Sequence, residues 1–256
     1  MQGLAGRYLG WGEEIGCIPF SSVFASWRAL APQSAPSTSP LAGVTPMDHK
    51  ERMKISQTLR DRLMRAIEVA RQHVSSDFDL NAGGADMRRK TGLTPAAVLV
   101  GIRPGVDGPR MVLTKRTSAL KHHPGQIAFP GGKQDPGDQD VRATALREAQ
   151  EEIGLAARQV DVLGPLGRHE TVTGFDVTPV LALIDADFVA VPEPGEVDTV
   201  FEVPLSFLMA PGNTRIEGRI WHGTRRRFYV MPYGPYYIWG ATARMIVALR
   251  TAWDAT

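Results

Sequence analysis

The chain has 256 residues, 43% hydrophobic and 22% charged, an ordinary composition for a soluble globular protein with room for one substantial domain and additions. A formal charge of +2 is too small to argue for a nucleic-acid partner. The single cysteine, Cys17, excludes an intramolecular disulfide and a cysteine-based metal site, which fits the reducing cytoplasm. No apolar run is long enough to span a bilayer, so we expect no membrane association.

Residues 1–46 differ in composition from the rest of the chain, with a stretch rich in Ala, Pro, Ser and Thr. Glu13 and Glu14 near the start argue against a signal or transit peptide. We expect an N-terminal extension that is disordered or weakly structured. Met47 and Met53 are alternative start positions, which leaves open whether residues 1–46 are translated in the native protein.

An amphipathic helix is predicted between Asp48 and about Ser76, because apolar residues recur there every three or four positions: Ile55, Leu59, Leu63, Ile67, Ala70 and Val74. We expect this helix to pack on the domain that follows, with partner binding or dimerisation as the alternative. Residues 77–92 are polar and contain glycine, which indicates a linker. Residues 47–92 would thus form a helix and linker, and residues 93–256 the main domain.

A strand-rich region begins at Pro95. Alternating and β-branched runs predict strands at residues 96–102, 111–115, 160–168, 172–184, 197–203, 215–221 and 226–231. The first two and the last two are expected to form hairpins, and Pro204 is expected at the first position of a short helix. A closing helix should run from Gly240 to about Trp253. Strands flanked by a few helices predict an α/β sandwich on a mixed sheet.

The segment REAQEEIG, residues 147–154, carries the clearest chemical signal. At roughly 100° per residue, a helix places Glu148, Glu151 and Glu152 on one narrow face. The opposite side is apolar, with Leu146, Ala149 and Ile153. Three like charges on one face repel one another, and a divalent cation such as Mg²⁺, which prefers oxygen ligands, would resolve the conflict. A solvated acidic helix face is the alternative.

A double glycine precedes this helix, in the run Phe129-Pro130-Gly131-Gly132-Lys133. The turn residues Asp135-Pro136-Gly137-Asp138 follow it. Asp138 or Asp140 can cap a helix that ends at about Ile153, with Gly154 as its C-terminal glycine. A backbone without side chains near an acidic helix could offer a carbonyl ligand to a metal and leave room for a phosphate.

Together these segments resemble the Nudix box, G-x5-E-x7-R-E-U-x-E-E-x-G-U, where U is bulky and apolar. The second half matches at Arg147, Glu148, Ala149, Glu151, Glu152, Gly154 and Leu155. The first half departs from the pattern, because Gln139 stands at the usual glutamate position and Gly132 lies one residue further upstream than the standard spacing.

Two upstream segments narrow the resemblance. L-T-K-R at residues 113–116 and G-Q-I-A-F-P-G-G at residues 125–132 resemble the coenzyme A pyrophosphatase branch of the Nudix hydrolases, which tolerates a longer loop before the helix. The resemblance runs from about Leu93 to Trp253 and implies a Nudix-type α/β/α sandwich with a mixed β-sheet.

The resemblance implies metal-dependent hydrolysis of a phosphoanhydride. Glu148 and Glu152 are assigned as the principal Mg²⁺ or Mn²⁺ ligands, and the carbonyl of Gly131 as a backbone ligand. Glu151 is a further ligand or the base that orients water, a role for which Glu148 also stays open. Arg147 lies four residues before Glu151 and is expected to hold it in position rather than to contact substrate.

Lys115 and Arg116 end a predicted strand shortly before the glycine loop. With the open backbone at Gly132, they are candidates for binding substrate phosphates, since Arg suits bidentate contact and Lys a point-charge contact. A solvated strand end is the alternative. Lys121 is a weaker candidate of the same kind.

Other residues fit both structural and functional roles. His122 and His123 are expected to shape their loop or contact substrate rather than to act as acid or base, and His169 to be structural. Most of the late aromatic residues are expected in the core rather than stacked on an adenine: Tyr233, Tyr236, Tyr237 and Trp239. Candidates for one more carboxylate from a loop across the site are Glu170, Glu196 and Glu202, of which Glu196 has the most loop-like setting.

The leading interpretation is a coenzyme A pyrophosphatase that converts coenzyme A or its thioesters to 3′,5′-ADP and (acyl-)phosphopantetheine. Alternatives are a pyrophosphatase for ADP-ribose, dinucleotides or nucleoside triphosphates, and a Nudix module that binds nucleotides without cutting them. The expected partner is a small molecule rather than nucleic acid or membrane, a homodimer is left open, and the expected location is cytoplasmic.

Overall fold

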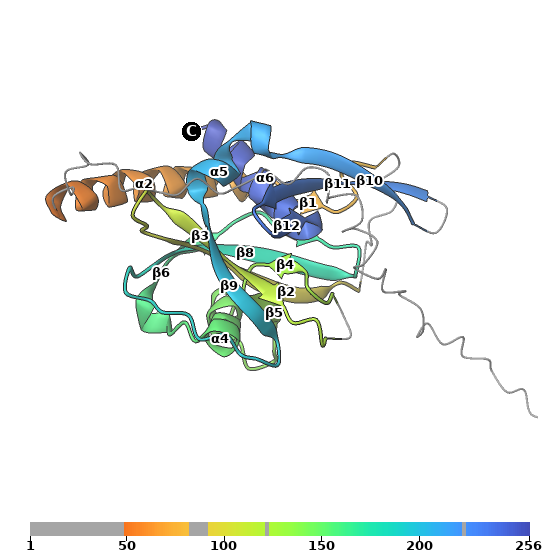
Figure 1. Cartoon of the computed structure of the whole chain (residues 1–256), viewed down its shortest axis with the longest axis horizontal. Helices are drawn as coiled ribbons and strands as arrows, with labels where there is room; N and C mark the ends of the chain where they lie inside the picture. Colours follow the sequence, from red (N-terminus) through yellow and green to blue (C-terminus); the bar gives the residue numbers. More distant parts are fainter. Residues whose placement is uncertain (1–48, 82–91, 121–122, 222–223) are drawn as a thin grey trace, which may run out of the picture. The chain divides into compact units, whose positions relative to one another are not determined.

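A computed structural model describes residues 49–81, 92–120, 123–221 and 224–256 (Figure 1). The expectations for residues 1–46, for a start at Met47 and for most of the linker fall outside these ranges. Lys121 and His122 also lie outside them.

The described ranges contain groups of consecutive strands separated by helices. The helices are α2 (His49–Ala70), α4 (Val141–Ile153), α5 (Leu205–Met209) and α6 (Gly240–Asp254), with 3₁₀ turns at Ala157–Gln159 and Pro211–Asn213. The strands of the main sheet are β1 (Ser75–Ser76), β2 (Thr94–Arg103), β3 (Arg110–Arg116), β4 (Ile127–Ala128), β5 (Gly131–Lys133), β6 (Val160–Pro165), β7 (His169–Glu170), β8 (Phe175–Ile184) and β9 (Val197–Pro204). A smaller sheet contains β10 (Arg215–Trp221), β11 (Thr224–Tyr233) and β12 (Tyr236–Trp239).

The main sheet is mixed. In the described part of the chain its nine strands run in the order β1-β7-β8-β2-β3-β4, with β5 also paired to β2, β6 to β8 and β9 to β3. The central pair β2–β8 is parallel, whereas β2–β3 and β3–β9 are antiparallel. The smaller sheet, β10-β11-β12, is antiparallel throughout. The predicted hairpins at residues 96–115 and 215–231 are confirmed, although the second turn falls partly outside the described residues.

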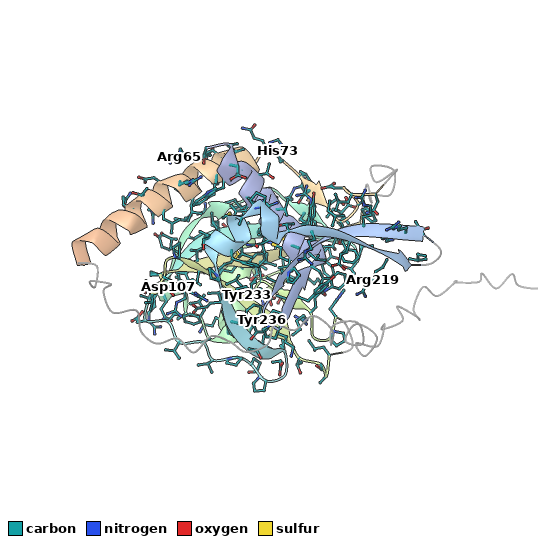
Figure 2. The ribbon with its side chains drawn as sticks, turned by 45° about the horizontal axis from the view of Figure 1, so that its top comes forward. Arg65, His73, Asp107, Arg219, Tyr233 and Tyr236 are labelled. Atoms are coloured by element: carbon teal, nitrogen blue, oxygen red, sulfur yellow. The ribbon has the colours of Figure 1, made fainter. Side chains whose placement is uncertain are left out.

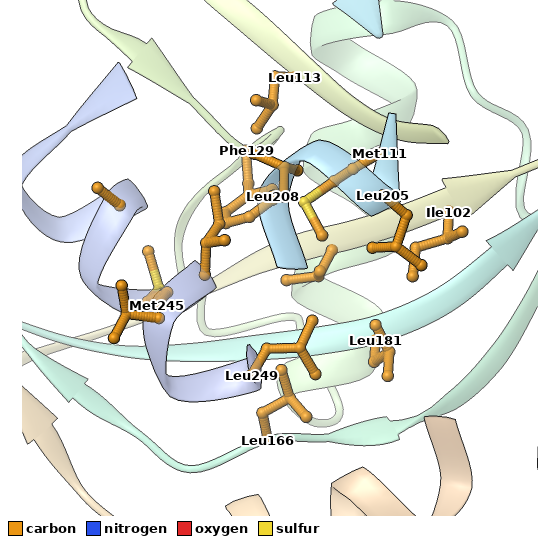
Figure 3. Close-up of a cluster of buried hydrophobic side chains, with 14 of the residues drawn as sticks. Ile102, Met111, Leu113, Phe129, Leu166, Leu181, Leu205, Leu208, Met245 and Leu249 are labelled. Carbon is orange, nitrogen blue, oxygen red and sulfur yellow. The ribbon is translucent and has the colours of Figure 1, made fainter. Parts of the chain in front are cut away.

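Helices cover both faces of the main sheet, so the alternating side chains of a strand enter two different apolar clusters. In β2, Val100 and Ile102 join one apolar cluster, which includes residues of α2, α5 and α6. Ala97 and Leu99 join a second cluster, with residues of α4. Figure 1 shows α4 on one side of the sheet and the other helices on the opposite side, and Figure 3 shows part of the first cluster. The predicted α/β/α sandwich is confirmed.

Helix α2 ends at Ala70, so the prediction that it continues to Ser76 is wrong. Ser75 and Ser76 instead form the buried strand β1, which pairs in parallel with His169 and Glu170 of β7. Val74, expected on the apolar stripe, is exposed. The start of the predicted linker is also part of the fold, since Phe78 is buried.

Three further boundaries differ from expectation. The strand expected over residues 160–168 stops at Pro165 and resumes as β7. The next begins at Phe175 rather than at Val172, because a turn with Gly174 at φ 90° precedes it. Pro204 is the N-cap of α5 and not its first residue, since its ψ of 130° still belongs to the strand. None of the helices in the described ranges is long and apolar enough to cross a bilayer.

Helix α2 offers a test of how firmly it belongs to the core. Leu63 is fully buried in the first cluster, whereas its neighbour Met64 is exposed. Leu63→Ala should lower the free energy of unfolding by about 2–5 kcal/mol, because it removes buried methyl groups and leaves a cavity. Met64→Ala is the matched control and should change stability little. Urea unfolding of the two variants measures the difference, and equal stabilities would show that α2 is not packed as described.

Candidate active site

Helix α4 has sharply defined ends. The Asp140 carboxylate accepts hydrogen bonds from the backbone N–H groups of Arg142 and Ala143, and Gly154 ends the helix in the left-handed conformation at φ 69°. Both the expected cap and the C-terminal glycine are confirmed. Ala145, Ala149 and Ile153 are buried against the sheet, which fixes the rotation of the helix about its axis.

The three glutamates do not share one environment. The Glu152 side chain is 3% exposed and that of Glu148 is 15% exposed, whereas that of Glu151 is 60% exposed. Glu152 is therefore directed toward the sheet, and only Glu151 fits the expectation of an open acidic face. The buried pair is the unusual feature, because ionised carboxylates are rarely taken out of water without partners.

The glycine loop provides the surface against which these carboxylates lie. The Gly131 N–H donates to Glu152 Oε2 at 3.2 Å. A Cβ at Gly132 would lie 2.5 Å from Glu148 Oε2, so the missing side chain leaves the space that this carboxylate uses. Gly131 has φ 153°, and a Cβ there would lie 2.5 Å from Val98 Cα. The structure thus brings Gly131 and Gly132 together with Glu148 and Glu152.

Arg147 lies at the centre of a polar network. Its Nη1 donates to Glu148 Oε1 and to Glu151 Oε2, both at 2.9 Å. Its Nε and Nη2 donate to the two carboxylate oxygens of Asp138 at 3.0 and 2.9 Å, and Nη2 also donates to the Lys133 carbonyl at 3.1 Å. The Arg147–Glu151 pair matches expectation. Asp138, considered from the sequence only as a possible helix cap, instead binds Arg147.

The pKa values of the buried carboxyls reflect their setting. Burial raises the pKa of Glu152 to about 7, against the lowering effects of the Gly131 N–H and of Arg116. Burial also raises the pKa of Glu148, against the lowering effect of Arg147. The charge of Glu196 raises both pKa values; that of Glu148 also raises the pKa of Glu152, and that of Glu151 raises the pKa of Glu148. A positive charge placed here would favour the ionised forms.

These donors suit a hard divalent cation, which takes carboxylate and carbonyl oxygens. Within the described ranges no three acidic, histidine or cysteine side chains already converge as a metal-binding cluster. Arg147 at Glu148 and Arg116 at Glu152 supply the positive charge instead. The mutual repulsion of the buried carboxylates is the observation that fits a cation at this place.

Lys115 and Arg116 have different partners. Arg116 Nη1 lies 3.4 Å from Glu152 Oε1, so this residue joins the carboxylates. Lys115 Nζ lies 2.6 Å from Asp198 on β9, which lowers the pKa of that carboxyl through a hydrogen bond. The strand pairing is irregular between Lys115 and Arg116. A substrate phosphate would therefore compete with Asp198 for Lys115.

Of the three candidates for a further carboxylate, Glu196 is the one whose charge acts on Glu148 and Glu152. Glu202 is paired with Arg103 and Arg110. Glu170 is buried in the short strand β7. The electrostatic effect of Glu196 thus separates it from the other two.

His169 and His123 both make contacts that support the fold. His169 is fully buried, with Nδ1 2.9 Å from Ser75 Oγ and Nε2 3.1 Å from Asp77 Oδ1. His123 has φ 54°, and its carbonyl accepts from the Gln126 N–H in the turn before β4. Both observations agree with the structural reading of these residues.

The late aromatic residues are half-buried, and three of the four pack against other rings. Tyr236 stacks on Phe201 with centroids 3.6 Å apart, and Tyr233 meets Phe207 at 5.0 Å. Trp239 meets Phe228 edge-on. Figure 2 shows Tyr233 and Tyr236 close together on β11 and β12. The Tyr237 hydroxyl donates to Glu217. These contacts agree with packing rather than with a free stacking surface.

The fold and the site define an α/β/α protein with buried carboxylates of one helix set against a glycine loop. The sequence model of the NUDIX domain matches residues 92–221. The chain belongs to the Nudix hydrolase family. Members of this family generally use divalent metal ions.

Similar proteins carry the same family name. The chain is 42% identical over 153 residues to "Uncharacterized Nudix hydrolase NudL" of Cronobacter sakazakii, which covers 59% of this chain and 78% of that protein. The protein of the same name from Photorhabdus laumondii is 39% identical over 138 residues, 54% of this chain and 74% of that one. Among solved structures, the NUDIX domain of Shewanella oneidensis NrtR complexed with ADP ribose is 15% identical, with TM-score 0.42, and the match covers 65% of this chain and 90% of that chain.

The two glycines should respond differently to an added methyl group. Gly132→Ala should displace the flexible Glu148 carboxylate and lower hydrolytic turnover by about 100-fold, the scale of a ~1 Å misplacement in an active site. The fold should persist, because only a side-chain end has to move. Gly131→Ala should instead lower thermal stability, since backbone atoms of β2 are in the way.

Gly137→Ala is the matched control in the same loop, because no atom lies within 4 Å of its added Cβ. It should retain both turnover and melting temperature. Normal turnover in Gly132→Ala would contradict the position described for Glu148.

Proposed function

We propose that this chain is a metal-dependent coenzyme A pyrophosphatase, which cleaves the diphosphate of coenzyme A or its thioesters to 3′,5′-ADP and (acyl-)phosphopantetheine. The proposal includes Mg²⁺ or Mn²⁺ as the cation, a small nucleotide-type molecule as the partner and the cytoplasm as the location. It rests on family membership and on the arrangement of the two upstream segments.

The proposal rests mainly on the two upstream segments, residues 113–116 and 125–132, which form one continuous unit. Strand β3, which contains L-T-K-R, pairs with β4, where Thr114 faces Ala128 and Lys115 faces Ile127. Backbone hydrogen bonds of Arg116 with Gln126 and Gly125 close the unit. The chain then passes directly from β4 into Gly131. The two segments thus lie together beside Glu152, which Arg116 and Gly131 both contact.

In the proposed mechanism, Glu148 and Glu152 hold the cation, with Gly131 as a backbone ligand. The cation would polarise a phosphoryl oxygen and lower the pKa of a water molecule. Arg147 fixes Glu148 and Glu151 relative to each other. Glu151, the exposed member of the three, can orient or deprotonate the attacking water. No residue of the chain has to form a covalent intermediate with the substrate.

Substrate phosphates would be bound by the basic groups at the end of β3 and by the backbone at Gly132, next to the Glu148 carboxylate. Coenzyme A carries a 3′-phosphate in addition to its diphosphate, so more than one cationic contact is expected. Lys115 is half-exposed in its ion pair with Asp198 and can exchange that carboxylate for a phosphate. Exposed ion pairs of this kind contribute little stability, so the exchange costs little.

A hydrolysis panel tests the proposal. Wild-type protein with Mg²⁺ or Mn²⁺ is incubated with coenzyme A, dephospho-coenzyme A, an acyl-coenzyme A, ADP-ribose, a dinucleotide and a nucleoside triphosphate, and products are identified by mass. Coenzyme A should be preferred over its dephospho form. Preference for ADP-ribose or a triphosphate would replace the substrate assignment, and no hydrolysis at all would favour a nucleotide-binding module.

The same panel includes variants of the proposed ligands. Glu148→Gln and Glu152→Gln should each lower turnover by at least about 100-fold, the scale observed when a group that stabilises transition-state charge is removed. Circular dichroism should show an unchanged fold. A variant that retains near-normal turnover with Mg²⁺ would exclude the ligand role of its residue.

A further inference from the structure

Asp138 is a nearly buried carboxylate within the loop that leads into α4. Its side chain is 7% exposed, and its two oxygens face the Nε and Nη2 edge of Arg147 at 3.0 and 2.9 Å. Such a bidentate pair fixes the plane as well as the position of a guanidinium. The Arg147 hydrogen bonds hold the pKa of the Asp138 carboxyl well below its usual range, so the pair stays charged at neutral pH.

The remaining hydrogen bonds of Arg147 are all directed at the proposed active site. Nη1 donates to Glu148 and Glu151, and Nη2 donates to the Lys133 carbonyl at the end of β5. A rotation of the guanidinium would therefore move the donor away from both carboxylates together. Asp138 opposes that rotation from the opposite edge.

The sequence makes this arrangement unexpected. Counting back from Arg147, the Nudix pattern has its first glutamate at position 139, where this chain has a neutral and exposed glutamine. The loop between Gly132 and the helix is one residue longer than the standard spacing, and the carboxylate that reaches Arg147 comes from the preceding residue. This chain therefore has an acid one residue before the position of the pattern's glutamate, and the side chain of that acid is shorter.

We propose that Asp138 is the positioning residue of this active site, and that it supplies the carboxylate absent at Gln139 by orienting Arg147, and through it Glu148 and Glu151, toward the cation. The inference deepens the proposed metal-dependent hydrolysis and rests on it. Asp138 itself does not contact substrate, because Arg147 and the Asp135 N–H occupy its oxygens. The carboxylate thus acts on metal affinity and turnover through Arg147.

Asp138→Asn removes the charge at nearly constant shape. It should weaken Mn²⁺ binding by about 10- to 100-fold, the usual effect of losing a group that supports a metal ligand. The Mn²⁺ affinity is measured without substrate, from the electron paramagnetic resonance signal of the free ion. Turnover on the best panel substrate should fall in parallel, and the metal concentration for half-maximal rate should rise. Asp107→Asn, an exposed aspartate in the β2–β3 turn, is the control.

A rescue variant separates positioning from simple structural support. Asp138→Asn combined with Gln139→Glu returns a carboxylate to the position that the family pattern uses, on a side chain one methylene longer. The double variant should recover at least half of the change in the logarithm of the Mn²⁺ dissociation constant that Asp138→Asn causes. Failure to recover would overturn the assignment, as would unchanged Mn²⁺ affinity in Asp138→Asn.

The outcomes also distinguish this inference from the proposed function. A wild-type protein that binds Mn²⁺ but cleaves no member of the panel would refute the hydrolase proposal, while the affinities of the variants would still test Asp138. A large drop in melting temperature of Asp138→Asn with normal Mn²⁺ affinity would show a purely structural role and overturn the inference.

Discussion

The burial of Glu152 and Glu148 is the constraint to which the rest of the site responds. A carboxylate removed from water loses several kcal/mol of hydration unless charges and hydrogen bonds replace it. Gly131 supplies an N–H, Gly132 supplies space, and two arginines supply charge. The fold provides these groups by pairing the glycine strand β5 with β2 and packing α4 on the same region. These groups offset part of the cost of burying two carboxylates, and the proposed cation would offset it further.

Local signals in the sequence predicted much of the fold. The ends of α4 follow from Asp140 and Gly154, which act within one turn of the chain. The sandwich follows from strands that are apolar on both faces. The C-terminal end of α2 could not be predicted in this way, because Ser75 and Ser76 leave the helix to pair with a strand more than ninety residues later. A helical pattern in the sequence does not show where the helix ends when the following residues pair with a distant strand.

For the candidate site, the sequence predicted which residues of α4 lie near one another but not their contacts with other elements. Spacing within one helix placed Glu148, Glu151 and Glu152 near one another, but the burial of Glu152 depends on how the helix is rotated against the sheet. The contact of Arg147 with Asp138 depends on the path of an irregular loop, for which no periodicity exists. The pairing of Lys115 with Asp198 requires the register of β3 and β9. Each missed feature is a contact between elements rather than a property of one element.

Strand β1 determines where the folded unit begins. The family match starts at residue 92, yet Ser75 and Asp77 hold the buried His169 from both sides. Leu63 and Ile67 fill the apolar cluster shared with α6. A fragment cut at the family boundary would leave an imidazole without hydrogen-bond partners and an uncovered apolar groove, which favours self-association. For expression or domain grafting, the folded unit is therefore larger than the segment that the family model matches, and it includes α2 and β1.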